Sequence, residues 1–204
     1  RSGDKETFQR YIEKLKSEPD SKNPNLDVLL TIAMHTPFII PDQEYYNNRF
    51  VERQNELELS QKQRVFNNNY VKQFASILYF DDALRNFISE YKKLPAFENT
   101  IFVITGDHRM PEIPISTQVD RFHVPLVIYS PMLEKAEKFS GVTTHFDITP
   151  SLLALLDGKE YISRPTTASW IGHGLDNSVE YRNLNSYPLM RNKNELMDFI
   201  EGNN

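Results

Sequence analysis

The chain has 204 residues, of which 39% are apolar and 25% are charged, and its formal net charge is −5. This length fits one domain with a real hydrophobic core, and the composition excludes a wholly disordered or collagen-like chain. Because acidic residues outnumber basic ones, the charge gives no reason to expect nucleic acid as a partner. Cysteine is absent, which excludes a disulfide framework, a thiolate metal site and a Cys nucleophile within the chain.

The first third of the chain predicts a helix followed by a buried strand. Apolar side chains recur at helical spacing over residues 1–17, which indicates a helix. Residues 27–33 form a nearly continuous apolar run, which is typical of a strand buried on both faces. Residues 39–60 are polar and give no clear pattern.

The middle of the chain predicts one long helix and two more strands. Apolar residues recur every three or four positions from residue 64 to residue 94, and Pro95 ends this helix. Residues 101–104 and 124–129 are short apolar runs that we expect to be strands.

The last quarter predicts shorter elements. Residues 151–156 are expected to be helical, with Thr149 as the N-cap. Residues 167–171 and 187–190 have the composition of short strands, and residues 192–200 resemble a last helix that begins with a capping box.

Strands that alternate with helices predict an α/β fold with a mainly parallel sheet. Ligands of such sheets bind at the carboxyl ends of the strands. Three polar residues follow predicted strand ends: His35 follows the run at 27–33, and Asp107 and His108 follow the run at 101–104. We therefore expect these three side chains to open into one cleft.

The sequence Gly106-Asp107-His108 can be interpreted in two ways. A carboxylate next to an imidazole suits Zn or Mn, so the pair could supply two metal ligands. Alternatively, Asp107 caps a turn and His108 bonds to a loop carbonyl, and a lone motif of this kind carries a large false-positive rate. His35 has the same two interpretations, as a donor to an anionic substrate oxygen or as a structural residue.

Other histidines are weaker candidates. His123 precedes the run at 124–129, which is the wrong end of a parallel strand for a site. His145 and Asp147 lie before a predicted helix, where hydrogen bonding to the helix start explains both.

Five segments in a fixed order favour the functional interpretation of these residues. They are residues 31–38, 79–88, 99–108, 123–131 and 145–153. Their succession resembles the C-terminal half of the sulfatase branch of the alkaline phosphatase superfamily, and it is most similar to lipoteichoic-acid-synthase-like phosphoglycerol transferases.

The resemblance implies an alkaline-phosphatase-like three-layer sandwich and a metal-dependent enzyme that cleaves or transfers a phosphate or sulfate ester. It implies that Asp107 and His108 are metal ligands and that His35 contacts the anionic group of the substrate. The pairing of a carboxylate with a histidine favours Mn or Zn over Ca. The implied substrate is an anionic ester, such as a phospholipid head group, a glycan or a sulfated sugar.

The resemblance also implies that the nucleophile and the acidic metal ligands precede this chain. We therefore expect residues 1–204 to be the C-terminal portion of one catalytic domain, with a family-like core over 25–158 and a C-terminal extension over 159–204. The expected partner is the N-terminal half of the same domain, and the chain alone is expected to be inactive. The whole protein is expected outside the cytoplasm of a bacterium, with a membrane anchor in the missing N-terminal region.

Two alternatives stay open. The first is a sulfatase with a formylglycine nucleophile, and the second is a non-catalytic α/β binding module. The upstream sequence discriminates among the three: a Thr or Ser nucleophile supports phosphoryl transfer, Cys-x-Pro-x-Arg supports the sulfatase, and neither supports the binding module.

Overall fold

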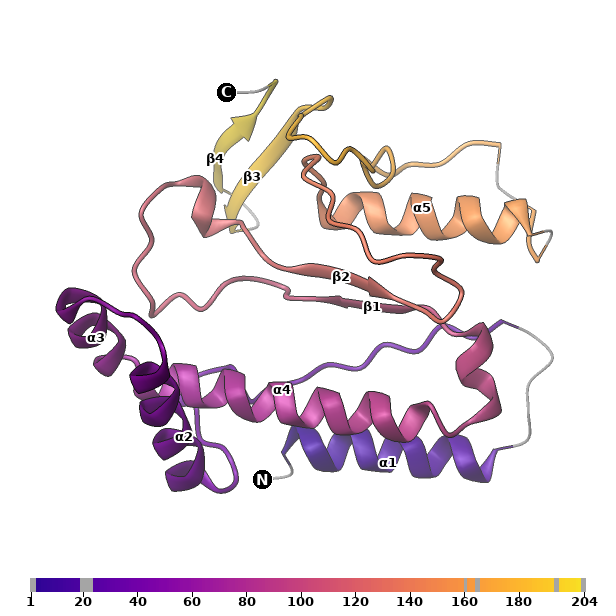
Figure 1. Cartoon of the computed structure of the whole chain (residues 1–204). Helices are drawn as coiled ribbons and strands as arrows, with labels where there is room; N and C mark the ends of the chain where they lie inside the picture. Colours follow the sequence, from indigo (N-terminus) through magenta and orange to yellow (C-terminus); the bar gives the residue numbers. More distant parts are fainter. Residues whose placement is uncertain (1–2, 19–23, 160, 164–165, 193–194, 203–204) are drawn as a thin grey trace. The chain divides into compact units, whose positions relative to one another are not determined.

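The computed structural model describes residues 3–18, 24–159, 161–163, 166–192 and 195–202 (Figure 1). The chain divides into two compact units, Arg1–Leu133 and Glu134–Asn204, and each is described here by itself. Within the described ranges, no helix combines the length and the apolar composition needed to cross a membrane.

The described part of the first unit contains four α-helices, α1 (Asp4–Ser17), α2 (Gln43–Glu56), α3 (Gln61–Asn68) and α4 (Val71–Tyr91), and the 3₁₀ helix η1 (Pro95–Asn99) follows α4. The predicted N-terminal helix is confirmed as α1, whereas α2 lies in the stretch that gave no pattern.

The single long helix predicted from residue 64 to residue 94 is wrong, because the structure divides it into α3 and α4. The division follows a run of three asparagines, whose side chains compete with helical hydrogen bonds. The backbone N–H groups of Asn69 and Tyr70 bond to the carbonyls of Phe66 and Asn67, and these short-range bonds close α3 before α4 begins.

The core of the first unit lies where α1 packs against α4. The rings of Phe8 and Phe87 stack with their centroids 4.6 Å apart. Phe102 and Tyr129 extend this cluster from the two strands. A second cluster joins α2 to α4 around the buried rings of Tyr46 and Tyr79.

Two strands of the first unit, β1 (Phe102–Thr105) and β2 (Leu126–Tyr129), pair antiparallel with Thr105 opposite Leu126. The expected mainly parallel sheet is therefore a wrong prediction for the described part of the chain, where the two named sheets are both antiparallel. The reason is the connection between β1 and β2. A parallel pair needs a crossover helix, whereas this connection holds only the short 3₁₀ turn η2 (Val119–Arg121) and returns along the first strand.

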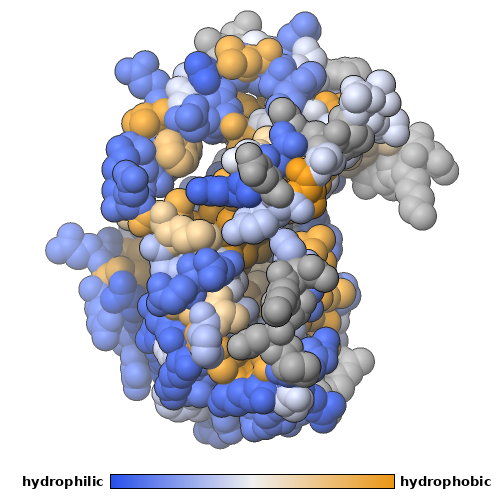
Figure 2. All heavy atoms as spheres, turned by 90° about the vertical axis from the view of Figure 1, so that its right-hand side faces the viewer, coloured by the Kyte–Doolittle hydropathy of each residue, from blue (hydrophilic) through white to orange (hydrophobic). Residues whose placement is uncertain are grey.

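The run at 27–33, predicted as a strand buried on both faces, is extended but joins no sheet. Its two faces differ in environment. Leu29 packs against the α1–α4 core, whereas Val28 and Leu30 are 84% and 75% exposed. Leu26 and Ile32 continue the exposed row at every second residue. Figure 2 shows apolar side chains in orange that reach the surface between hydrophilic ones.

The second unit contains α5 (His145–Gly158) and a hairpin of β3 (Tyr187–Asn192) and β4 (Glu195–Ile200). The strand predicted at 187–190 is confirmed as part of β3. The predicted last helix at 192–200 is wrong, because an antiparallel partner lies directly before it and a segment this short forms no stable helix alone. The predicted strand at 167–171 is also wrong, since those residues carry no strand pairing.

The helix predicted at 151–156 exists but begins earlier. Thr144, rather than Thr149, is its N-cap, and Asp147 completes a capping box with Thr144. Pro150 lies inside α5, within the second turn of the helix.

Candidate functional site

Asp107 and His108 lie directly after β1, where the chain leaves the sheet. Asp107 Oδ2 is 3.8 Å from His108 Nε2, and both side chains are more than half exposed. Asp107 Oδ1 also accepts a hydrogen bond of 2.9 Å from the backbone N–H of His108, which fixes the carboxylate over the turn. The two side chains therefore face one another rather than opposite sides of the chain.

His108 presents one ring nitrogen to Asp107 and the other to the backbone. Its Nδ1 lies 2.6 Å from the carbonyl oxygen of Arg109, so this nitrogen carries a proton as the donor of that bond. In the neutral ring, Nε2 then keeps its lone pair. A histidine whose other nitrogen is held by a carbonyl is the arrangement found at metal ligands.

His35 lies in the turn that ends the extended segment, and its Nδ1 is 2.9 Å from the carbonyl oxygen of Thr36. The backbone N–H of Phe38 donates to the carbonyl of His35, which closes the turn. The buried carboxylate of Asp4, at the start of α1, accepts from the N–H groups of Ile32 and Ala33 at 3.0 and 3.2 Å. The first turn of α1 thus anchors the segment that carries His35.

Glu112 connects this turn with the one that carries His108. The hydroxyl of Thr36 donates to Glu112 Oε1. That hydrogen bond lowers the pKa of Glu112 below its usual range, the backbone N–H of Glu112 itself lowers it further, and burial opposes both. His35 and His108 are close enough to act on the same pKa. Both imidazoles therefore lie within electrostatic reach of one carboxylate. No local pattern points to Glu112, because its partner Thr36 is 76 positions away.

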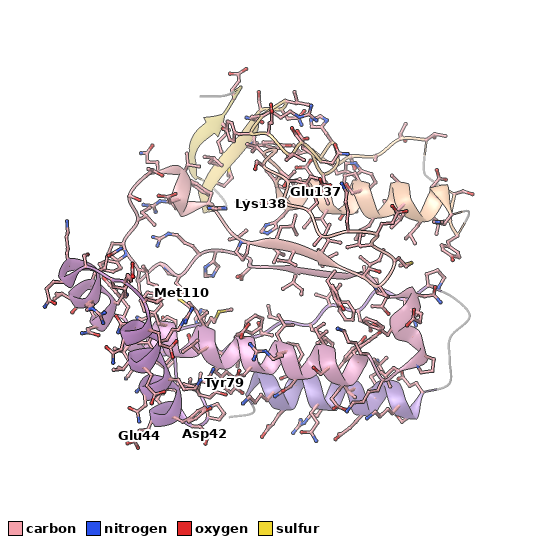
Figure 3. All side chains as sticks on the ribbon, viewed as in Figure 1. Asp42, Glu44, Tyr79, Met110, Glu137 and Lys138 are labelled. Atoms are coloured by element: carbon pink, nitrogen blue, oxygen red, sulfur yellow. The ribbon has the colours of Figure 1, made fainter. Side chains whose placement is uncertain are left out.

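The loop between His108 and Glu112 is held by Arg109. Its guanidinium donates to the carbonyl oxygens of Met110 and Ile113, at 2.7 Å each. Met110, which belongs to this loop, is labelled in Figure 3. Because these guanidinium N–H groups bond to carbonyls of the loop, the observed role of Arg109 is to stabilise the turn.

His123 was placed at the wrong end of a parallel strand, and the antiparallel pairing removes that argument. Since Thr105 lies opposite Leu126, the residues that precede β2 lie beside the residues that follow β1. Thr105 Oγ1 donates to the carbonyl of Pro125 at 2.8 Å, which shows this proximity directly. The reason for setting His123 aside therefore fails, because it depended on a parallel strand, and the role of His123 stays open to experiment.

The donor atoms of Asp107 and His108 suit a shared metal ion in chemistry and in spacing. Metal–nitrogen and metal–oxygen bonds of about 2.0–2.2 Å allow two ligand atoms 3.8 Å apart to bind one ion. Across the described residues, no group of three or more His, Asp or Glu side chains is arranged to hold a metal. By itself, the pair is therefore not a complete metal site.

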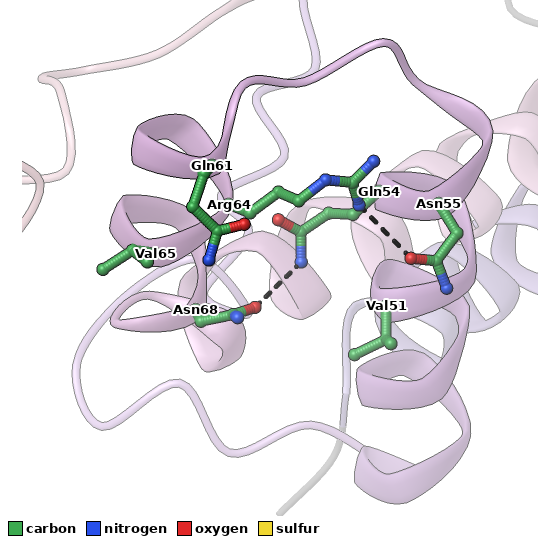
Figure 4. A pocket seen from close by; sticks show the side chains of 7 residues that line it. All are labelled: Val51, Gln54, Asn55, Gln61, Arg64, Val65 and Asn68. Carbon is green, nitrogen blue, oxygen red and sulfur yellow. Dashed lines mark hydrogen bonds between the residues drawn. The ribbon is translucent and has the colours of Figure 1, made fainter.

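A cavity of about 240 Å³ lies between α2 and α3, in a different place from the His35 and His108 turns (Figure 4). Its walls are mainly amide side chains, and Gln54 Nε2 donates to Asn68 Oδ1 at 3.1 Å. Arg64 donates to Asn55 Oδ1 at 3.2 Å across the same space. None of the predicted site residues lines it.

In the second unit, the buried carboxylate of Asp147 accepts hydrogen bonds that hold the start of α5. Its carboxylate accepts from the N–H and hydroxyl of Thr144 and from the N–H groups of His173 and Gly174. Burial raises the pKa of Asp147, but these hydrogen bonds outweigh burial and hold the pKa below its usual value. The expectation of hydrogen bonding at the start of the helix is confirmed for this residue.

Comparison with known proteins gives two relatives from Bacillus subtilis (strain 168). The chain is 26% identical to the lipoteichoic acid synthase-like protein YvgJ over 170 residues, which are 75% of the chain and 25% of that protein. It is 28% identical to lipoteichoic acid synthase 1 over 202 residues, which are 88% of the chain and 28% of that protein. The chain therefore spans about a quarter of the length of these relatives.

No solved structure matches the chain. The model of one protein family, described as Sulfatase, matches residues 2–158, which include His35, Asp107 and His108. A match over this much of the sequence decides membership: the chain belongs to the sulfatase family.

Proposed function

We propose that this chain is part of a metal-dependent enzyme that hydrolyses or transfers a phosphoric or sulfuric ester, with phosphoglycerol transfer as the nearest analogy. The observation that carries the proposal is the Asp107–His108 pair. Its two donor atoms lie 3.8 Å apart after β1, inside the region that the Sulfatase model matches. Sulfatase-family enzymes are usually metal-dependent.

In this proposal, Asp107 and His108 hold a divalent ion, Mn or Zn rather than Ca. The chemistry supplied by such an ion when bound is neutralisation of negative charge on the ester oxygens and activation of a nucleophile. His35, with its ring protonated, donates a hydrogen bond from Nε2 to one anionic oxygen of the substrate, which stabilises charge that develops during transfer. The nucleophile is expected outside these 204 residues.

The remaining part of a sulfatase-family domain is the proposed partner of the chain. The exposed row of Leu26, Val28, Leu30 and Ile32 supports this idea, because exposed apolar rows of this kind mark interaction surfaces. The chain also spans only about a quarter of its relatives. An extracytoplasmic location and an anionic ester substrate complete the proposal, and nucleic acid has no place in it.

Turnover by the full-length protein that contains this chain tests the proposal. We expect metal-dependent release of p-nitrophenol from bis(p-nitrophenyl) phosphate or p-nitrophenyl phosphate, and less from p-nitrophenyl sulfate. Asp107→Asn and His108→Ala should abolish it, whereas His173→Ala, which changes an exposed histidine of the second unit, should not. Activity on the sulfate ester alone would favour the sulfatase alternative, and no activity on any ester would contradict the proposal.

A further inference from the structure

We propose that Glu112 is a positioning residue that fixes the orientation of His35 through Thr36 and couples the His35 turn to the Asp107–His108 turn. Its effect on turnover rests on the function proposed above. The tie between the two turns is a property of the fold and can be tested without any activity.

The tie runs through a single residue, Thr36. The side chain of Thr36 donates to Glu112 Oε1, and the backbone carbonyl of Thr36 meets the Nδ1 of His35 at 2.9 Å. A carboxylate that holds the Thr36 side chain therefore also holds the peptide that orients the imidazole. The nitrogen left for a substrate oxygen is Nε2 of His35.

The carboxylate also has an environment that a simple structural tie does not require. Oε2 of Glu112 is buried and has no hydrogen-bond partner among the described residues. A buried carboxylate oxygen without a partner is unfavourable unless opposite charge lies nearby. Among the groups that act on the pKa of Glu112 are His35 and His108, the two histidines of the candidate site.

The loop that carries Glu112 is held in place by hydrogen bonds on both sides of this residue. Arg109 donates to Met110 and Ile113, so it bonds to a carbonyl on each side of Glu112. On the other side of the tie, Asp4 anchors the backbone at Ile32 and Ala33, just before His35. Glu112 thus joins two segments that are each fixed independently, and its loss should loosen the His35 turn in particular.

Hydrogen–deuterium exchange of the full-length protein tests the tie. Glu112→Ala should increase exchange in peptides that contain residues 33–38, because the tie to Thr36 is lost. Glu112→Gln should keep exchange near the wild-type level, since the amide oxygen can still accept from Thr36. Glu58→Ala, which removes an exposed carboxylate, is the matched control and should change nothing in this segment.

Steady-state kinetics on the same variants test the consequence for the site. Glu112→Ala should lower kcat by about 10–100-fold, the range typical of residues that orient a site, while KM changes little. Glu112→Gln should recover most of this loss. Thr36→Val combined with Glu112→Ala should cost little more than either change alone, because both break the same hydrogen bond.

Each outcome decides the proposal. It is wrong if Glu112→Ala leaves exchange at 33–38 unchanged, and it is also wrong if exchange rises while kcat stays at the wild-type value. If the wild-type protein cleaves no ester, the proposed function fails, but exchange still decides whether Glu112 orders the His35 turn.

Discussion

At the residue scale, the proposed chemistry depends on three polar side chains. Asp107 and His108 face one another after β1, and His35 lies in a turn whose side chain at Thr36 bonds to Glu112. His35 and His108 each use Nδ1 on a backbone carbonyl, which leaves Nε2 of both rings for a ligand. Nε2 of a neutral His108 ring offers a lone pair to a metal ion, whereas Nε2 of His35 donates to an anionic oxygen only when its ring is protonated. The side chains of His35, Asp107 and His108 are all exposed.

His35 should matter for turnover rather than for folding. His35→Ala in the full-length enzyme removes a donor to an anionic oxygen, so kcat should fall by about 10²–10³-fold. The melting temperature and the metal content should stay close to the wild-type values, because the ring is exposed and is not a proposed metal ligand. Normal specific activity together with a lowered melting temperature would show that His35 is structural.

The candidate site residues could be predicted from the sequence because they lie in short motifs. Their arrangement in space could not be predicted. One shared cleft was expected because parallel strands would place these residues at the same sheet edge. In the structure, β1 and β2 are antiparallel and the segment before His35 joins no sheet. What brings the turns within reach of one carboxylate is the Thr36–Glu112 contact between residues 76 positions apart. No local pattern encodes such a contact.

At the element scale, helices with a regular apolar stripe were predictable and boundaries set by polar side chains were not. The apolar stripe of α1, which packs on α4, made this helix predictable. The break between α3 and α4 was not predictable, because it depends on local backbone hydrogen bonds in an Asn-rich segment. The start of α5 depends on the Thr144–Asp147 capping box rather than on Pro150. The segment over Glu195–Ile200 became a strand because its partner β3 lies next to it in the chain.

Asp147 should make the stability of the second unit depend on pH. Its folded pKa is lowered, so its contribution is present above the unfolded pKa of about 3.9 and is lost as pH falls through the folded value. Asp147→Asn keeps one acceptor oxygen but removes the negative charge, so hydrogen bonds that are worth about 1.5–3 kcal/mol each to a charged group should weaken. Thermal melts from pH 7 to pH 3 should show wild type and variant converging at low pH. A constant difference between them across this range would rule out the charge as the cause.

At the scale of the whole molecule, one row of apolar side chains is exposed in the described part of the first unit. Alternate residues from Leu26 to Ile32 are exposed, while Leu29 on the opposite face packs into the α1–α4 core. The sequence predicted burial on both faces, and the described structure provides it on one. The division of the domain into a core at 25–158 and an extension at 159–204 stays a prediction.

The exposed row should contribute little to the free energy of unfolding of the isolated chain and should stabilise the full-length protein. Leu30→Ser should change the free energy of unfolding of the 204-residue chain very little, because the side chain is 75% exposed. In the full-length protein the same change should cost about 2 kcal/mol, the value of a buried leucine side chain. Val65→Ser, at an exposed position of α3, is the control and should have little effect in either context. Equal effects of Leu30→Ser in both proteins would refute a covering partner.

The isolated 204-residue chain is expected to release no p-nitrophenol from any of the three esters, since no nucleophile motif precedes its first family-like segment. Metal-dependent turnover by this chain alone would overturn that expectation. The same assay on the full-length protein supplies the positive control.

Metal binding by the full-length protein is the most direct test of the central claim that Asp107 and His108 are metal ligands. Mn and Zn affinities can be measured by equilibrium dialysis with elemental analysis for wild type, Asp107→Ala, His108→Ala and the control His173→Ala, with circular dichroism melts to verify folding. We predict that each of the first two changes weakens binding of at least one of these ions by about tenfold or more, whereas the control retains the wild-type affinity. Folded Asp107→Ala and His108→Ala proteins that bind both ions as tightly as the wild type would contradict the account.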